Sequence, residues 1–107
     1  MERTFVETDE FTKTWKSLKL NDDILIDIQQ KLIYDSTSGD LIEGTGGARK
    51  LRFQIPGNRG KSSGGRLIYY DNPSTECIIL LFTYTKNQQE NLTDTKKKEI
   101  KNMIKNL

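Results

Sequence analysis

Residues 44–70 read GTGGARKLRFQIPGNRGKSSGGRLIYY, and this stretch carries six basic side chains and no acidic one: Arg49, Lys50, Arg52, Arg59, Lys61 and Arg66. Its two ends alternate between apolar and polar residues, which is the period of a β-strand. Its middle, residues 54–65, is rich in glycine and polar residues and predicts a loop. The stretch therefore predicts a β-hairpin with a cationic face, and such a face suits a polyanion.

The alternation within residues 48–55 separates the two faces of the first strand of this hairpin. Leu51 and Phe53 fall on one face, and Lys50 and Arg52 fall on the other, where Arg66 joins them from the return strand. A solvated strand normally mixes acidic residues or threonine among its basic ones, so we favour phosphate binding. The alternative is an edge strand that its charges protect from pairing. On this open face, Arg66 is expected to contribute nothing to the core.

The flanking segments predict the scaffold of the hairpin. Residues 3–7 predict a short strand, and apolar stripes predict two helices, over 9–19 and from 22 to about 34, that form an αα-hairpin. Residues 66–71 and the apolar segment 76–84 predict two further strands, and residues 96–106 predict a last helix. The order is β-α-α-β-β-β-α.

Consecutive strands joined by short loops pair antiparallel. We therefore expect an α+β fold with an antiparallel sheet of about four strands, the αα-hairpin packed on one face, and a C-terminal helix. All helices are expected on that one face, because the other would carry the basic residues. The 107 residues are expected to form one domain, 1–107.

The composition excludes several kinds of site. The chain has no histidine, which is the commonest general base and metal ligand, and its single cysteine, Cys77, excludes an internal disulfide and a multi-thiolate metal site. It has no apolar run near 18 residues, and its first residues, MERTFVETDEF, are too polar for a signal peptide. We expect a cytoplasmic protein without membrane association.

The charges are segregated along the chain. Residues 1–43 carry five basic and ten acidic side chains, and residues 71–107 carry six basic and five acidic ones. The net charge of +2 for the whole chain therefore hides a charge of +6 on residues 44–70. The lysines of the last predicted helix are interpreted as a solvated face. The electrostatic field is therefore set by the hairpin.

Two tyrosine positions are candidates for contacts with bases. Tyr69 and Tyr70 are neighbours and point to opposite faces, so one belongs in the core, and Tyr70 shares a face with Arg66. Tyr84 and Lys86 are two residues apart at the end of the apolar strand, so their side chains are expected on the same face. They either flank the cleft of the basic residues, or Tyr84 only caps the core.

The element order and several motifs together resemble the RelE/ParE superfamily, and within it the HigB-type branch of toxins from bacterial type II toxin–antitoxin systems. The motifs are the run from Gly44 to Arg52, the pieces Gly60-Lys61 and Gly64-Gly65-Arg66, the pair Tyr69-Tyr70 and the exit Tyr84-Thr85-Lys86. The resemblance covers nearly the whole chain.

This resemblance implies a ribosome-dependent mRNA endoribonuclease that cuts the codon in the A site. The 2′-hydroxyl of the substrate attacks the adjacent phosphate and leaves a 2′,3′-cyclic phosphate and a 5′-hydroxyl, without a metal or any other cofactor. A lysine whose pKa neighbouring cations lower would act as the base, and arginines would stabilise the transition state. The missing histidine is compatible with this chemistry.

Carried over to this sequence, the resemblance assigns catalysis to four cations and RNA binding to five further residues. The catalytic set is Arg66, which is expected to clamp the phosphate, with Lys50, Arg52 and Lys86. The RNA-binding set is Arg49, Lys61, Arg59, Tyr70 and Tyr84. Some relatives have a catalytic tyrosine after the last strand, but residues 87–107 contain none, so that role is empty or falls to Tyr70 or Tyr84.

The expected partners are the 70S ribosome, mRNA and a cognate antitoxin with a helix-turn-helix region. Two other functions stay open. One is a ParE-like toxin that inhibits DNA gyrase by binding it without nuclease activity, and the other is a non-catalytic RNA-binding module. The cluster of Lys50, Arg52, Lys61 and Arg66 favours the nuclease, because a gyrase binder has no need to gather phosphate ligands on a sheet.

Overall fold

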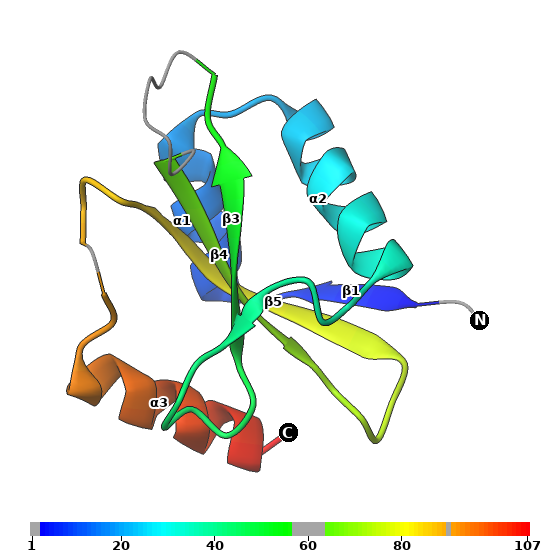
Figure 1. Ribbon diagram of the computed structural model, residues 1–107, viewed down its shortest axis with the longest axis vertical. Helices are drawn as coiled ribbons and strands as arrows, with labels where there is room; N and C mark the ends of the chain where they lie inside the picture. Colours follow the sequence, from blue (N-terminus) through cyan, green and yellow to red (C-terminus); the bar gives the residue numbers. More distant parts are fainter. Residues whose placement is uncertain (1–2, 57–63, 90) are drawn as a thin grey trace.

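The computed structural model describes residues 3–56, 64–89 and 91–107, and Figure 1 shows their arrangement. The elements in chain order are β1 (Thr4–Glu7), α1 (Asp9–Leu18), α2 (Asp22–Tyr34), β2 (Asp40–Leu41), β3 (Arg49–Gln54), β4 (Gly64–Asp71), β5 (Cys77–Thr85) and α3 (Asp94–Lys105). This is the predicted α+β order with one additional short strand, β2. None of the helices among these residues combines the length and the hydropathy that crossing a membrane requires.

The five strands form one sheet in the order β1-β5-β4-β3-β2. Strands β2 to β5 pair antiparallel, as predicted for neighbours joined by short connections, whereas β1 pairs parallel with β5. The expectation of a purely antiparallel sheet was wrong at β1, because that rule applies to strands that follow each other directly. Strands β1 and β5 are separated by the whole αα-hairpin and three other strands, so their relative direction is set by packing.

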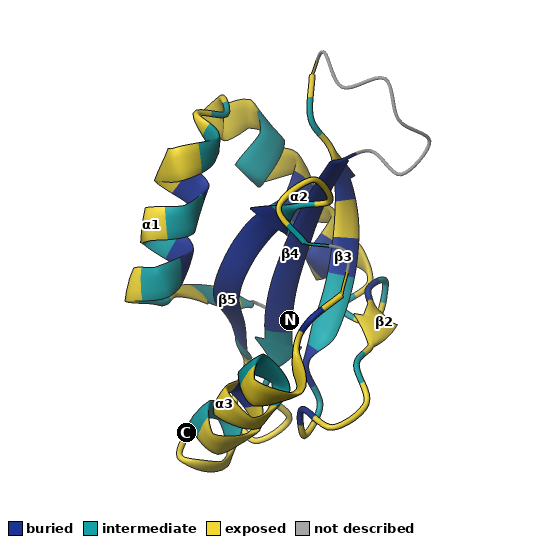
Figure 2. Ribbon diagram, turned by 90° about the vertical axis from the view of Figure 1, so that its left-hand side faces the viewer, coloured by how far each residue is buried: buried dark blue, intermediate teal, exposed yellow. Residues whose placement is uncertain are grey.

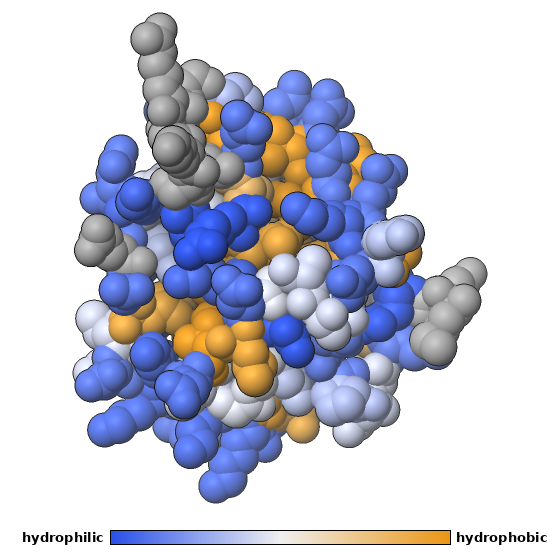
Figure 3. Space-filling view, viewed as in Figure 1, coloured by the Kyte–Doolittle hydropathy of each residue, from blue (hydrophilic) through white to orange (hydrophobic). Residues whose placement is uncertain are grey.

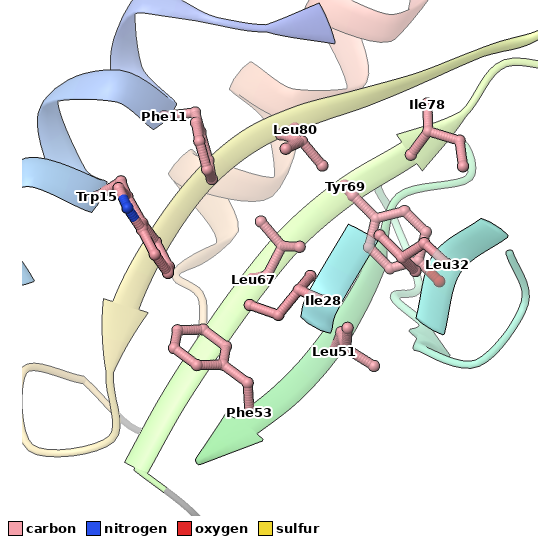
Figure 4. Packing of buried hydrophobic residues seen from close by; sticks show 10 residues of the cluster. All are labelled: Phe11, Trp15, Ile28, Leu32, Leu51, Phe53, Leu67, Tyr69, Ile78 and Leu80. Atoms are coloured by element: carbon pink, nitrogen blue, oxygen red, sulfur yellow. The ribbon is translucent and has the colours of Figure 1, made fainter. Parts of the chain in front are cut away.

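Helices α1 and α2 cover one face of the sheet, and α1 passes behind the strands in Figure 1. Thr8 caps α1 by accepting a hydrogen bond from the Phe11 backbone N–H at 3.0 Å, and Asn21 caps α2 in the same way. The rings of Phe11 and Trp15 are stacked with their centroids 6.0 Å apart. The Trp15 ring also packs against the ring of Phe53 on β3. Figure 4 shows how these side chains fill the space between helices and strands.

Helix α3 lies on the opposite face, which corrects the expectation that all helices share one face. Its buried Ile100 packs with Ile68 and Phe82 in a second apolar cluster, so that face also needed a cover. The cover is partial, because Arg52 and Gln54 of β3 remain exposed. Figure 2 shows the difference between the buried strands β4 and β5 and the partly exposed β3. Three of the basic residues, Lys50, Arg52 and Arg66, lie on this second face.

Two glycines let the β-hairpin approach its neighbours closely. A Cβ on Gly65 would lie 2.4 Å from the Phe53 ring, so this ring rests on the bare backbone of β4. Gly47, before β3, has a φ of 123°, and a Cβ there would lie 3.0 Å from the Tyr70 ring. These contacts fix β3 against β4 at both of its ends.

Candidate active site

Three polar side chains stand in one row across three neighbouring strands. Arg52 of β3 is the direct partner of Arg66 on β4, and Arg66 is the direct partner of Tyr84 on β5. Lys50 lies two residues before Arg52 on β3, opposite Ile68, and therefore on the same face. Like charges directly opposite each other destabilise a sheet, so a facing arginine pair is unfavourable unless an anion neutralises it. The row therefore has the composition of a phosphate site.

Arg66 is buried, with 5% of its surface exposed. Its Nη1 donates a hydrogen bond to the Gly65 carbonyl oxygen at 2.9 Å. Burial is the main cause that lowers the pKa of Arg66, and the charge of Arg52 lowers it further. The expectation that Arg66 lies on an open face without packing was wrong, because β4 is a central strand flanked by β3 and β5. A buried guanidinium is poorly hydrated and gains strongly from an anion.

Lys50 is half-buried, and its pKa lies below the ordinary value for lysine. Burial contributes most to this shift, followed by the charges of Arg52 and Arg66, while Asp40 of β2 opposes it. Arg52 is the outermost of the cations, and its Nη1 lies 3.9 Å from the Asp40 carboxylate. A lowered pKa increases the fraction of neutral lysine at a given pH, and the neutral amine is the form that can accept a proton.

Tyr84 is 3% exposed, and its hydroxyl is buried without a hydrogen-bond partner among the described residues. Burial raises the pKa of this phenol, although the charges of Arg66 and Arg52 act against the shift. The group is therefore a neutral proton donor beside a cationic cluster. A buried unsatisfied hydroxyl is unfavourable, and this one has its proton available for donation to a bound group.

Two further predicted residues, Lys86 and Tyr70, belong to the described part of the chain. Lys86 is exposed in the turn after β5, and its backbone N–H donates to the carbonyl oxygen of Gly64, two residues before Arg66, at 2.9 Å. Tyr70 is half-buried on the second face, as predicted, and its neighbour Tyr69 is fully buried on the first. Arg59 and Lys61 lie outside the described residues.

Arg49 does not join the row. The alternation of β3 places its side chain on the first face of the sheet. There its Nη1 donates to the carbonyl oxygens of Gly39 at 2.9 Å and Thr37 at 3.4 Å. The side chain thus holds the segment between α2 and β2. Its position follows from the same alternation that places Lys50 on the second face.

Lys97 of α3 was missed by the sequence prediction. It lines a small hollow of about 110 Å³ together with Lys50, Ile42, Asn91 and Leu92, and its charge contributes to the lowered pKa of Lys50. The sequence feature that could have identified Lys97 is its spacing. Lys97 precedes the buried Ile100 by three residues, so it borders the apolar stripe of the helix. The lysines of α3 are therefore not all solvated.

The cations gather where the second face is left uncovered. Figure 3 shows strongly hydrophilic side chains over the ends of β3 and β4, with apolar groups between them and α3. Among the described residues, no three histidine, cysteine, aspartate or glutamate side chains come together in a way that could hold a metal ion. The arrangement offers cations, a lysine of lowered pKa and a phenol.

Comparison with known proteins gives a consistent result. The family described as "RelE toxin of RelE / RelB toxin-antitoxin system" matches residues 2–107. Among solved structures, a double arginine-to-alanine mutant of the E. coli toxin RelE in the free state has 18% identity and a TM-score of 0.57, over 84% of this chain and 90% of that one.

Two further structures of E. coli proteins show the same fold. The isolated RelE toxin has 14% identity and a TM-score of 0.55, over 95% of this chain and 99% of that one. The intact RelBE toxin–antitoxin complex has 16% identity and a TM-score of 0.53, over 78% of this chain and 95% of that one.

Proposed function

The chain belongs to the RelE toxin family of type II toxin–antitoxin systems, and from this premise we propose that it is a ribosome-dependent endoribonuclease that cleaves mRNA in the A site. The observation that carries the proposal is the row of Arg52, Arg66 and Tyr84 with Lys50 beside it. Two facing arginines and a lysine of lowered pKa are what transesterification at a phosphate needs. Within the family, the glycine and basic motifs support a place in the HigB-type branch.

In the proposed reaction, the neutral Lys50 amine takes the proton from the 2′-hydroxyl of the RNA. The O2′–phosphorus bond forms as the phosphorus–O5′ bond breaks, and the Tyr84 hydroxyl gives its proton to the departing O5′. Arg66 and Arg52 stabilise the additional charge on the phosphate oxygens in the transition state. The products are a 2′,3′-cyclic phosphate and a 5′-hydroxyl, and no metal takes part.

The remaining predicted residues take supporting roles in this proposal. Lys86 supplies a further cation next to the row, Tyr70 offers a ring to a neighbouring base, and Arg59 and Lys61 contact RNA from the β3–β4 connection. Arg49 is left out of the RNA-binding set because it faces the other side of the sheet.

We also propose that a cognate antitoxin with a helix-turn-helix region neutralises the chain in the cytoplasm. Solved structures of E. coli RelE include its complex with RelB and its complex with a RelB peptide, and these support a protein partner for a toxin of this fold. The expected result is that co-expression of a small protein encoded beside the toxin restores growth.

The testing experiment is 5′-end mapping of mRNA from cells briefly induced for the wild type, Lys50→Met or Arg52→Ala. New ends in phase with the reading frame, absent or strongly reduced in both variants, are expected. Growth arrest without such ends would overturn the nuclease proposal and favour a ParE-like inhibitor that binds DNA gyrase. Ends without any reading-frame phase would indicate cleavage that does not depend on the ribosome.

A further inference from the structure

A second hollow adjoins the catalytic row. It has a volume of about 410 Å³ and lies between α1, the end of β5 and the start of α3. Its lining consists of Glu10, Thr14, Phe82, Thr83, Tyr84, Gln88, Gln89, Thr93 and Lys96. Tyr84 belongs both to this hollow and to the row with Arg66 and Arg52, so a nucleotide bound at the row has its neighbouring base within reach. The volume falls in the range of ~300–1,000 Å³ typical of small-ligand sites.

We propose that this hollow, the base cleft, receives a nucleobase next to the scissile phosphate and favours bases that carry an amino group over uracil. The inference rests on the proposed nuclease function, since it assigns the sequence preference of that same site. Nothing in the catalytic chemistry itself requires such a preference.

The charges of the base cleft exclude a phosphate as its occupant. The Glu10 carboxylate lies at the cleft and accepts a hydrogen bond from Lys96 Nζ at 2.7 Å, and the Glu99 carboxylate lies 3.5 Å from the same Nζ. The one lysine of the lining is therefore already neutralised by two carboxylates. A neutral polar group fits this environment, whereas a second anion would be repelled.

Two buried aromatic side chains, Phe82 and Tyr84, belong to the lining of the base cleft. The rings of Phe82 and Tyr84 are both buried, and their centroids lie 6.0 Å apart. Lys96 Nζ sits 4.6 Å from the centroid of the Phe82 ring, which holds α3 over the end of β5. A lining that combines aromatic rings with polar side chains matches a planar heterocycle that has hydrogen-bonding groups on its edge.

The hydrogen-bonding groups of the rim decide the base preference. Gln88 Oε1 accepts a hydrogen bond from the Thr85 backbone N–H at 2.8 Å, and the Thr83 hydroxyl donates to Thr14 Oγ1 at 3.2 Å, so these side chains are already held by other groups of the protein. The Glu10 carboxylate can only accept, and an exocyclic amino group of adenine, cytosine or guanine satisfies it. Uracil presents two carbonyl oxygens around a single N–H, and these would face the carboxylate.

The first test is cleavage by a reconstituted ribosomal system programmed with mRNAs that vary in the bases around the cut. The wild type is expected to disfavour uracil at one position by about fivefold or more, which corresponds to ~1 kcal/mol. Glu10→Gln should lose most of this discrimination. Glu99→Gln is the matched control, because it removes the other carboxylate beside Lys96 without altering the cleft lining, and it should keep the wild-type preference.

The second test does not depend on cleavage. Isotope-labelled protein is titrated with adenosine, cytidine, guanosine and uridine, which lack a phosphate for the cationic row. Backbone amide signals of Glu10, Gln88 and Gln89 should shift with the first three nucleosides more than with uridine. Equal shifts with all four, or shifts confined to β3 and β4, would overturn the inference.

The two tests separate the inference from the proposed function. If the wild type makes no frame-phased cut, the proposal of ribosome-dependent cleavage is wrong, and the titration alone decides on the base cleft. If the wild type cuts and Glu10→Gln leaves the uracil discrimination unchanged, the nuclease proposal stands and the base cleft does not. A large loss of thermal stability in Glu10→Gln but not in Glu99→Gln would show that the Glu10–Lys96 pair is a structural brace, and the titration of the wild type then carries the decision.

Discussion

Arg52 and Arg66 face each other directly on the antiparallel strands β3 and β4. Arg66 is buried, while the Arg52 side chain is 56% exposed, and the carboxylate that pairs with it among the described residues is Asp40 at 3.9 Å. An exposed pair at that distance is weak. The sheet therefore keeps a repulsive pair at the position where the proposed chemistry needs two positive charges, which is the usual conflict between stability and function.

The first prediction follows from this repulsion. Arg52→Thr should raise the free energy of unfolding by ~0.2–1 kcal/mol, because it removes a like charge opposite Arg66 and adds a residue that favours strands. The same variant should lose most of its cleavage activity. Denaturant unfolding and a cleavage assay check both effects. Gln54→Thr, an exposed position on the same face of β3, is the control and should gain little. A destabilised Arg52→Thr would contradict the prediction.

The second prediction concerns pH. Because the pKa of Lys50 is lowered and the base must be neutral, the cleavage rate should rise with pH through that lowered pKa and then level off. Arg52→Gln removes one of the charges that lower the pKa of Lys50, so the midpoint of its profile should move to higher pH. Arg49→Gln lies on the opposite face and should leave the midpoint in place. Single-turnover rates on ribosome-bound mRNA across a pH series are the measurement.

The third prediction concerns the buried position of Arg66. Arg66→Ala should lower both the cleavage rate and the free energy of unfolding, the latter by ~1–3 kcal/mol, because the alkyl part of a buried arginine packs in the sheet. Arg66→Met keeps most of that packing and removes the charge. It should therefore retain more stability than Arg66→Ala while cleaving equally poorly. Cleavage by Arg66→Met close to the wild-type rate would show that Arg66 is structural only.

The sequence was sufficient for most of the fold because its signals are local. Alternation placed Leu51 and Phe53 in the core and Lys50 and Arg52 on the other face, and caps such as Thr8 marked the helices. The parallel pairing of β1 with β5 and the face on which α3 lies depend on long-range packing. No local sequence pattern predicts such packing. The burial of Arg66 was missed for the same reason, since alternation gives the face of a residue and not how deeply its neighbours cover it.

The last prediction compares two buried tyrosines that differ in their hydroxyl partners. The Tyr69 hydroxyl donates to the Ser36 carbonyl at 2.7 Å and accepts from the Gly39 N–H at 3.0 Å, whereas the Tyr84 hydroxyl has no partner among the described residues. Tyr69→Phe should lower the free energy of unfolding by ~1–3 kcal/mol, because a buried backbone N–H loses its acceptor. It should leave the intrinsic cleavage rate unchanged at temperatures where the variant is folded.

Tyr84→Phe should do the opposite. Removing an unsatisfied buried hydroxyl should keep or slightly raise the free energy of unfolding, and removing the proton donor should slow cleavage by ~10²-fold or more. Thermal unfolding of both variants beside single-turnover cleavage on the same ribosome complexes gives the comparison. Wild-type cleavage by Tyr84→Phe would remove this residue from the proposed reaction, and the exposed Lys86 of the predicted catalytic set would then be tested as the acid. A loss of stability in Tyr84→Phe as large as that in Tyr69→Phe would mean that the hydroxyl is satisfied in solution.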